Sequence, residues 1–133
     1  MATTYTRTIT KDCALSDRTL SFAKAYSADA EDNRAVTIPA GATNLEIDIG
    51  IAYAQLVSLF MAATADLTIK TNHSGSNPAP DNTIALKAMV PLVWNADSYF
   101  TNPLTADVTK LYVSNAGAVD TVLEIAALQD STP

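Results

Sequence analysis

The feature that most constrains this chain is a two-residue alternation of apolar and polar side chains. Leu45, Ile47 and Ile49 alternate with polar, charged or glycine neighbours. Because successive side chains of a β-strand point to opposite faces of a sheet, this pattern predicts a strand with one buried face. The same alternation, or a short apolar run between turn residues, recurs in segments 5–9, 19–28, 52–65, 67–70, 82–86, 90–94, 110–114 and 121–125. We therefore expect about eight strands in an all-β fold.

Turn signals separate these segments at intervals of roughly 8–12 residues, a spacing typical of β-sandwiches and barrels. Gly41 and Gly117 are the last residues of two short turn sequences, Pro-Ala-Gly and Asn-Ala-Gly. We expect the second of these turns to close a β-hairpin in which Gly117 takes a positive φ. No segment shows the alternating strand and helix rhythm of a nucleotide-binding fold. The sequence therefore predicts one antiparallel β-sandwich domain over residues 1–133, with flexible termini.

Two segments fit more than one structure. Segment 15–26 can place apolar residues on one face of a helix, but Leu20, Phe22 and Tyr26 also share one face of a strand. The Thr, Ser and Phe content of this segment favours the strand. Segment 52–65 is apolar on both faces and suits a buried helix, yet its branched and aromatic residues favour a central strand covered on both sides.

The predicted core contains the apolar residues that share the inward face of each expected strand. They are Leu45, Ile47, Ile49, Leu56, Leu67, Ile69, Ile84, Leu86, Val93, Leu111, Val113, Val122 and Ile125. Segment 72–81 contains Pro78 and Pro80 and no apolar residue larger than Ala79. Such a composition predicts a long exposed loop.

The charge of the chain argues against a nucleic-acid or membrane partner. Its net charge is −6, and its eight basic residues are scattered singly along the sequence. A phosphate-binding surface needs clustered Lys and Arg. The longest apolar run, 56–63, is interrupted by Ser58 and is far shorter than a membrane span. The N-terminus does not resemble a signal peptide, so we expect the protein to be made and soluble in a cytoplasm.

The side chains needed for common site chemistry are scarce. His73 and Cys13 are the only His and the only Cys, so they cannot supply the ligands of a zinc site. His73 also lies in the expected loop, where a catalytic base would not be held rigidly. Asp29, Glu31 and Asp32 lack the Gly and the distal Glu of a calcium loop and predict a solvated turn. We expect no catalytic residue, no cofactor and no metal, and hence no enzyme.

An aromatic group begins at the end of segment 90–94. Trp94, Tyr99 and Phe100 lie close together among Asn and Asp residues. They could stack on a sugar ring, or form an intersubunit contact, since Trp and Tyr are enriched at interface hot spots. The interpretation that we favour is a core Trp followed by a turn that tucks Tyr99 and Phe100 under the rim of the sandwich. Trp94, Tyr99, Phe100 and His73 form our candidate interaction surface.

The second half of the chain resembles small β-sandwich structural proteins that are encoded among the head genes of tailed bacteriophages. The resemblance lies in ADLTIKTN (65–72), PDNTIALK (80–87), VPLVW (90–94), DSYF (97–100) and ADVTKLYVSNA (106–116). It implies a jelly-roll-like sandwich and a capsid decoration, or cement, protein. Such a protein would be made in the host cytoplasm and would lie on the capsid surface of the virion, bound to the major capsid protein.

The resemblance also implies a homo-oligomer, most often a trimer. The chain itself favours assembly, because segments 52–65 and 90–94 carry no charge that would guard an exposed sheet edge. A carbohydrate- or receptor-binding module of the tail-fibre type is the alternative function, and its support is the aromatic group with its Asn- and Asp-rich surroundings.

Overall fold

The computed structural model describes residues 3–72 and 80–131, and these form ten β-strands and one short helix. The all-β class that the alternation predicts is confirmed. The elements are β1 (Tyr5–Ala14), β2 (Thr19–Ala28), β3 (Ala30–Ile38), β4 (Leu45–Ile51), the 3-10 helix η1 (Tyr53–Gln55), β5 (Leu56–Ala63), β6 (Leu67–Thr71), β7 (Asn82–Leu86), β8 (Leu92–Asn95), β9 (Val108–Ser114) and β10 (Thr121–Gln129).

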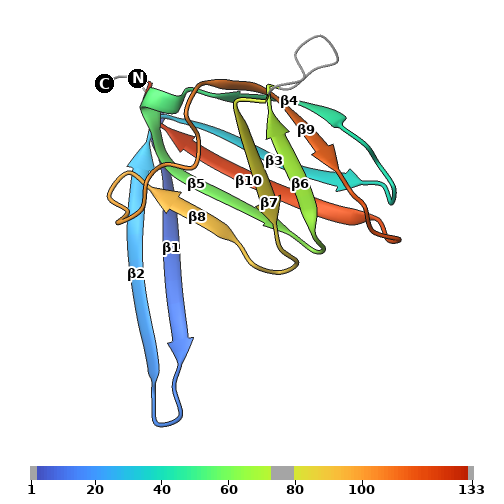
Figure 1. Ribbon diagram of the computed structural model, residues 1–133. Coiled ribbons are helices and arrows are strands. Elements are labelled where there is room, and N and C mark those ends of the chain that lie inside the picture. Colours follow the sequence, from blue (N-terminus) through green and yellow to red (C-terminus); the bar gives the residue numbers. More distant parts are fainter. Residues whose placement is uncertain (1–2, 73–79, 132–133) are drawn as a thin grey trace.

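Eight of the strands form a sandwich of two four-stranded sheets (Figure 1). The strand orders are β3-β10-β5-β8 and β4-β9-β6-β7, and every pair is antiparallel. From β3 onward, the first strand pairs with the last, the second with the seventh, the third with the sixth and the fourth with the fifth. This nested pairing is the winding of a jelly roll. We call the β3-β10-β5-β8 sheet the arm-side sheet and the other the opposite sheet.

The core lies between the inner faces of the two sheets. In β4, Ile47 and Ile49 are buried whereas Glu46 and Asp48 are exposed, as the alternation predicts. Most predicted core residues are buried there, and Leu45 packs against them while partly exposed. The predicted members that are buried are Ile47, Ile49, Leu56, Leu67, Ile69, Ile84, Leu86, Leu111, Val113 and Ile125.

Two predicted core residues lie outside the core. Val122 is 40% exposed, because its neighbour Leu123 is the residue that points inward, in register with Ala63 of β5. Val93 pairs with Phe60, and both are only half-buried. Adjacent apolar residues satisfy a two-residue alternation in either phase, so the pattern alone did not fix which face of β8 and β10 is inward.

The turn at 115–117 was predicted wrongly as a hairpin. It connects β9 to β10, which belong to different sheets, and the φ of Gly117 is not in the left-handed region. The buried side chain of Asn115 holds this crossing instead. Its Nδ2 donates to the carbonyl oxygens of Ile38 (3.1 Å) and Val119 (2.9 Å), and its Oδ1 accepts from the N–H of Gly117 (3.0 Å).

The ambiguous segments are settled in favour of strands. Residues 19–28 are strand β2, and residues 56–63 are strand β5 in the middle of its sheet. The expectation that β5 is covered on both sides holds only in part, since Phe60 and Ala62 on its outer face are half-exposed. The turn predicted at the acidic residues was also wrong for Glu31 and Asp32, which belong to strand β3. The loop predicted at 72–81 lies largely outside the described residues.

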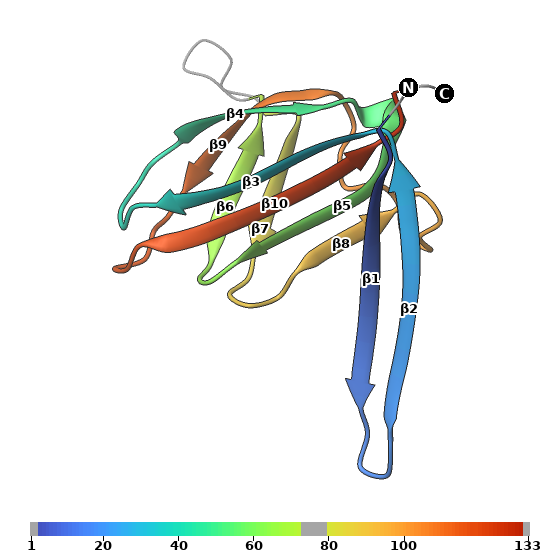
Figure 2. The same ribbon diagram turned by 180° about the vertical axis from the view of Figure 1, so that it is seen from behind.

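The β1–β2 hairpin, which we call the arm, leaves the sandwich. Its strands pair without interruption from Tyr5 opposite Ala28 to Ala14 opposite Thr19. The arm crosses the outer face of the arm-side sheet at one end and continues past the edge strand β8 (Figures 1 and 2). Every residue from Lys11 to Ser21 is exposed. The first two predicted strands therefore project from the sandwich instead of completing a sheet within it.

Candidate interaction surface

The two faces of the arm differ in the size of their side chains. One face carries mainly Thr, Ser and Ala. The other, which we call the large-residue face, carries residues at odd positions of β1 and even positions of β2. Its members are Tyr5, Arg7, Ile9, Lys11, Cys13, Leu20, Phe22, Lys24 and Tyr26. Because side chains alternate along each strand, these residues lie side by side on one surface.

At its root the arm is fixed to the arm-side sheet by Arg7. The Nη1 of Arg7 donates to the carbonyl oxygens of Ala126 (2.9 Å) and Ser58 (3.3 Å), in β10 and β5. Its Nη2 donates to Oδ1 of Asn33 (3.2 Å) and lies 3.8 Å from the carboxylate of Glu31. Burial lowers the pKa of Arg7, and the negative charge of Glu31 partly offsets this effect. One guanidinium thus joins the arm to three strands of the sheet.

A second attachment lies nearer to β8. The ammonium of Lys24 donates to Oδ2 of Asp97, and the hydroxyl of Tyr26 donates to Oδ1 of the same carboxylate (3.0 Å). These bonds, chiefly that from Lys24, lower the pKa of Asp97, while the bond to Asp97 raises the pKa of Lys24. Such exposed pairs contribute little to stability. Their effect here is to place the arm beside the segment that follows β8.

A groove of about 480 Å³ runs between the arm and this segment. Its walls carry aromatic side chains from both sides: Phe22 of the arm is 72% exposed, Phe100 is 81% exposed, and Tyr99 is fully exposed. The floor is polar, because Asn95 lines the groove and is 3% exposed. Ser58 of β5 is the cross-strand partner of Asn95. Among the described residues, neither Oδ1 of Asn95 nor Oγ of Ser58 has a hydrogen-bond partner.

The structure separates the residues of the predicted interaction surface. Tyr99 and Phe100 lie on the groove and are not tucked under the rim of the sandwich. Trp94 packs against the core instead, as the favoured interpretation expected, and its Nε1 donates to the carbonyl oxygen of Phe100 (3.0 Å). This bond fixes the backbone at Phe100 while both rings of the Tyr99 and Phe100 pair stay exposed. His73 lies outside the described residues. Phe22 is the third aromatic residue that lines the groove. The sequence predicted only a strand for its segment and gave no sign of this role.

Next to the arm root, the outer face of the arm-side sheet is apolar and hollowed. Ala35, Phe60 and Ala126 line a depression of about 370 Å³, together with Asn33, Arg34, Glu124 and Ile125. A second depression of about 170 Å³ continues from it along the sheet. Its lining residues are Ala62, Ala63, Thr64, Met89, Pro91, Val122 and Glu124. We call the two depressions together the sheet groove.

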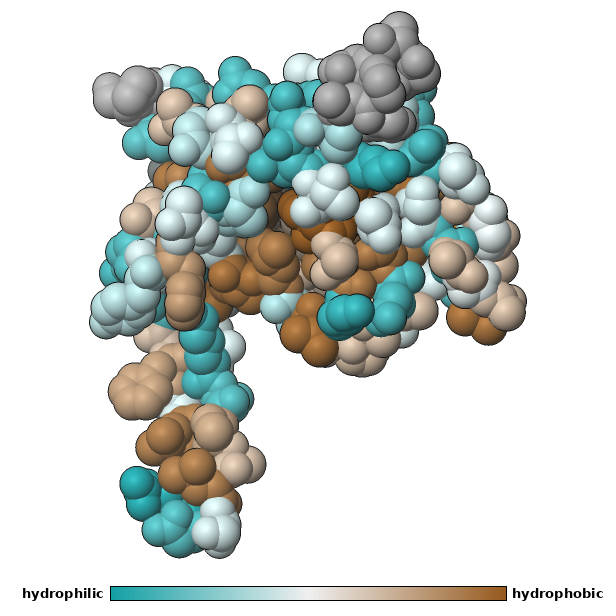
Figure 3. Space-filling view, in the orientation of Figure 1, coloured by the Kyte–Doolittle hydropathy of each residue, from teal (hydrophilic) through white to brown (hydrophobic). Residues whose placement is uncertain are grey.

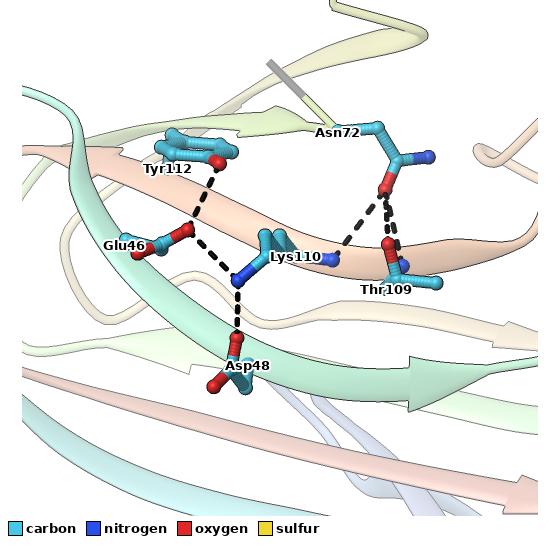
Figure 4. Close-up of polar contacts among 6 residues, drawn as sticks. All are labelled: Glu46, Asp48, Asn72, Thr109, Lys110 and Tyr112. Carbon is cyan, nitrogen blue, oxygen red and sulfur yellow. Dashed lines mark hydrogen bonds and ion pairs between the residues drawn. The ribbon is translucent and has the colours of Figure 1, made fainter. Parts of the chain in front are cut away.

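The outer face of the opposite sheet is polar and internally paired (Figure 4). The ammonium of Lys110 lies 2.9 Å from Oε1 of Glu46 and 2.8 Å from Oδ1 of Asp48, and the hydroxyl of Tyr112 donates to Glu46 (3.1 Å). These contacts raise the pKa of Lys110 and lower the pKa values of both carboxylates. At the end of the same sheet, Oδ1 of Asn72 accepts from the N–H of Thr109 (3.0 Å).

The acidic residues considered for calcium have separate partners. Asp32 accepts from Nε of Arg34 (2.7 Å) and from the N–H of Gly50 (2.8 Å), whereas Asp29 accepts from the N–H of Ser131 (2.7 Å). Over residues 3–72 and 80–131, no three His, Cys, Asp or Glu side chains come together as a metal site. Within the same ranges, no helix has the length and apolar character needed to cross a membrane.

No protein-family model matches this chain, and a comparison with curated proteins finds no match.

Proposed function

We propose that this protein is a structural protein of a tailed-phage virion, a capsid decoration protein that binds the major capsid protein and stabilises the shell. The observation that supports this best is the contrast between the two sides of the molecule. Among the described residues, none of the large apolar side chains that are exposed lies in a strand of the opposite sheet. Leu20, Phe22, Tyr99, Phe100 and Val122 all lie on the arm, the adjoining groove or the arm-side sheet.

This contrast suits a protein that binds a shell with one side and faces water with the other. Exposed apolar patches on a soluble domain usually mark a protein contact. The strands of the arm have ten residues each, so the arm is about 33 Å long, enough to reach a neighbouring subunit. Hydrophobic residues cover much of its free part, just short of a hydrophilic tip (Figure 3). The net charge of −6 favours a protein partner over nucleic acid.

The finer parts of the proposal rest on the resemblance of segments 65–116. These parts are the tailed phage, a position on the capsid instead of the tail, and assembly as a trimer. The jelly-roll fold is compatible with them, since this fold is common among viral capsid proteins and also among lectins. We further propose that the protein has no catalytic activity and that the exposed pair Tyr99 and Phe100 contacts the shell.

The test is to purify virions from infected cells and to measure the copy number of this chain by mass spectrometry and cryo-electron microscopy. We expect a fixed ratio to the major capsid protein. Shells that lack the chain should regain thermal stability when the purified protein is added. The double variant Tyr99→Ser/Phe100→Ser should bind shells at least ten-fold more weakly, whereas Thr83→Ser on the opposite sheet should bind normally. Virions without this chain would rule the proposal out.

A carbohydrate-binding module is the second candidate, and the aromatic groove is the observation that favours it. Phe22, Tyr99 and Phe100 offer ring faces, and Asp97 and Ser98 supply polar groups to the lining of the same groove. Ligand sites commonly combine apolar walls with a few directed polar groups. A glycan array probed with folded protein tests this candidate. Binding that Phe100→Ala abolishes would support it, and the absence of binding to any glycan would exclude it.

A further inference from the structure

We propose that the free part of the arm of one copy lies in the sheet groove of a second copy. The inference deepens the proposed function, because it rests on the homo-oligomer that the function includes and names the surfaces that form it. It concerns the contact between copies, whereas Tyr99 and Phe100 are proposed above for the contact with the shell.

The first argument is the continuity of the large-residue face. At the root of the arm, Arg7 and Tyr26 on this face are attached to the arm-side sheet and to the segment that follows it. Phe22 lies on the groove beside β8 and is 72% exposed, and beyond it the same face continues with Cys13 and Leu20, which are also exposed. A surface built to lie on a sheet therefore extends beyond the sheet of its own chain.

The second argument is that the sheet groove offers the same kind of support as the arm root already uses. Asn33 and Ala126, which accept hydrogen bonds from Arg7, also line the groove. The small side chains of Ala35, Ala62 and Ala126 leave space beside Phe60. Large arm residues such as Phe22 match this space, since a packed interface needs large side chains opposite small ones.

The third argument is charge. Glu124 lies at the junction of the two depressions of the sheet groove, and no ion pair involves it among the described residues. Lys11 lies opposite Phe22 on the arm and is likewise outside every ion pair of the described chain. Arg34, the other charge at the groove, is already paired with Asp32. Lys11 of one copy and Glu124 of the next are therefore complementary.

The last argument is geometry. The arm crosses its own sheet and leaves it past β8 (Figure 2), so its free part is directed away from its own sheet groove. A second sandwich placed beside β8 brings an arm-side sheet under the free part. Each copy has one arm and one groove, so a closed dimer or ring of copies satisfies every arm.

The area of such a contact can be compared with known interfaces. A standard interface buries about 1,600 Å² in total. A single buried aromatic side chain supplies about 150–250 Å² of this area.

Sedimentation equilibrium of the full chain at micromolar concentration measures the first consequence. We expect a mass that is a multiple of the 14.0 kDa monomer. The variant Leu20→Ser/Phe22→Ser should raise the dissociation constant at least ten-fold without loss of folding, because both residues are exposed in the monomer. Lys11→Glu and Glu124→Lys should each weaken assembly, and the two changes together should restore it. A monomer at all concentrations, or variants that assemble like the wild type, would overturn the inference.

Disulfide trapping locates the contact, since Cys13 on the arm is a free, exposed thiol. In Ala35→Cys and Val122→Cys, oxidation with diamide should join Cys13 of one copy to the new thiol of another and give a reducible covalent oligomer. Ala85→Cys, exposed on the opposite sheet, is the matched control and should give only the background of the wild type. Equal cross-linking in all three variants would contradict the inference. A monomeric protein that still occurs in virions would refute the inference alone, whereas a trapped oligomer absent from virions would refute only the proposed function.

Discussion

Replacement of Asn115 by Asp should turn the crossing between the two sheets into a pH-sensitive point of the fold. Asn115 is 1% exposed, and its amide nitrogen donates to the carbonyl oxygens of Ile38 and Val119 and to Oγ1 of Thr121. Asp has nearly the same shape, but when ionised it presents an oxygen to three oxygen atoms and donates nothing. The variant thus loses the donor and gains a repulsive charge at a site without water access.

The magnitude follows from these contacts. Each buried acceptor that loses its donor costs about 1–3 kcal/mol. Burial beside carbonyl oxygens also raises the pKa of the new carboxyl above its unfolded value of about 3.9. Between the two pKa values the folded state binds more protons than the unfolded state, so the free energy of unfolding falls as pH rises, by up to about 1.4 kcal/mol per pH unit. We expect Asn115→Asp to lose about 3–5 kcal/mol at pH 7 and clearly less at pH 4.

Urea unfolding at pH 4 and pH 7 measures this difference against the wild type at each pH. Asn115→Ala is the control, because it removes the donor without adding a titrating group. Its loss should be the same at both pH values. A loss for Asn115→Asp that is equal at pH 4 and pH 7, or below about 0.5 kcal/mol at pH 7, would refute the role assigned to this amide.

Three further predictions concern the core and the arm. Leu123→Ala should cost about 2–5 kcal/mol in urea unfolding, whereas Val122→Ala should cost less than about 0.5 kcal/mol, and the reverse order would mean that the inward face of β10 is assigned wrongly. Arg7→Met should release the arm root, so amide hydrogen exchange should become faster in β1 and β2 but not in β6; unchanged protection of the arm would contradict this attachment. Asp97 should titrate below the ordinary Asp range in NMR, because Lys24 and Tyr26 stabilise its ionised form. Its bonds to the arm should therefore persist in mild acid and be lost only as pH falls through that lowered pKa, which Lys24→Met should return toward its ordinary value.

The residue alternation was sufficient to predict the fold class, because β4, β6 and β9 each have one face in the core and one in water. It failed where both residues of a neighbouring pair are apolar, as at Val122 and Leu123. It also missed strand β3, whose first residues carry charged side chains on both faces, Glu31 on the outer face and Asp32 and Arg34 on the face that Ile38 shares. In each case the sequence contains the periodicity but not the identity of the surface that the strand contacts.

The same limit applies to the interaction surface. Strands β1 and β2 alternate as a sandwich strand does, and their sequence does not indicate that residues 11–21 are exposed. Trp94 and Phe100 are close in the sequence, yet the burial of each side chain depends on the path of the segment after β8. Phe22 lines the same groove as Phe100 across about 78 residues of sequence, and the bonds of Lys24 and Tyr26 to Asp97 bring the arm beside this segment.

The uninterrupted pairing of the arm limits how its length can change. The sandwich begins at β3, and no strand of the arm pairs with it. The arm can therefore be extended near its tip without altering the register of either sheet. One added residue per strand would exchange the two faces beyond the insertion, whereas two per strand would preserve them and move the tip outward by about 6.6 Å. Related proteins with longer or shorter arms should differ in such steps, and the spacing between the subunits that an arm connects should change with them.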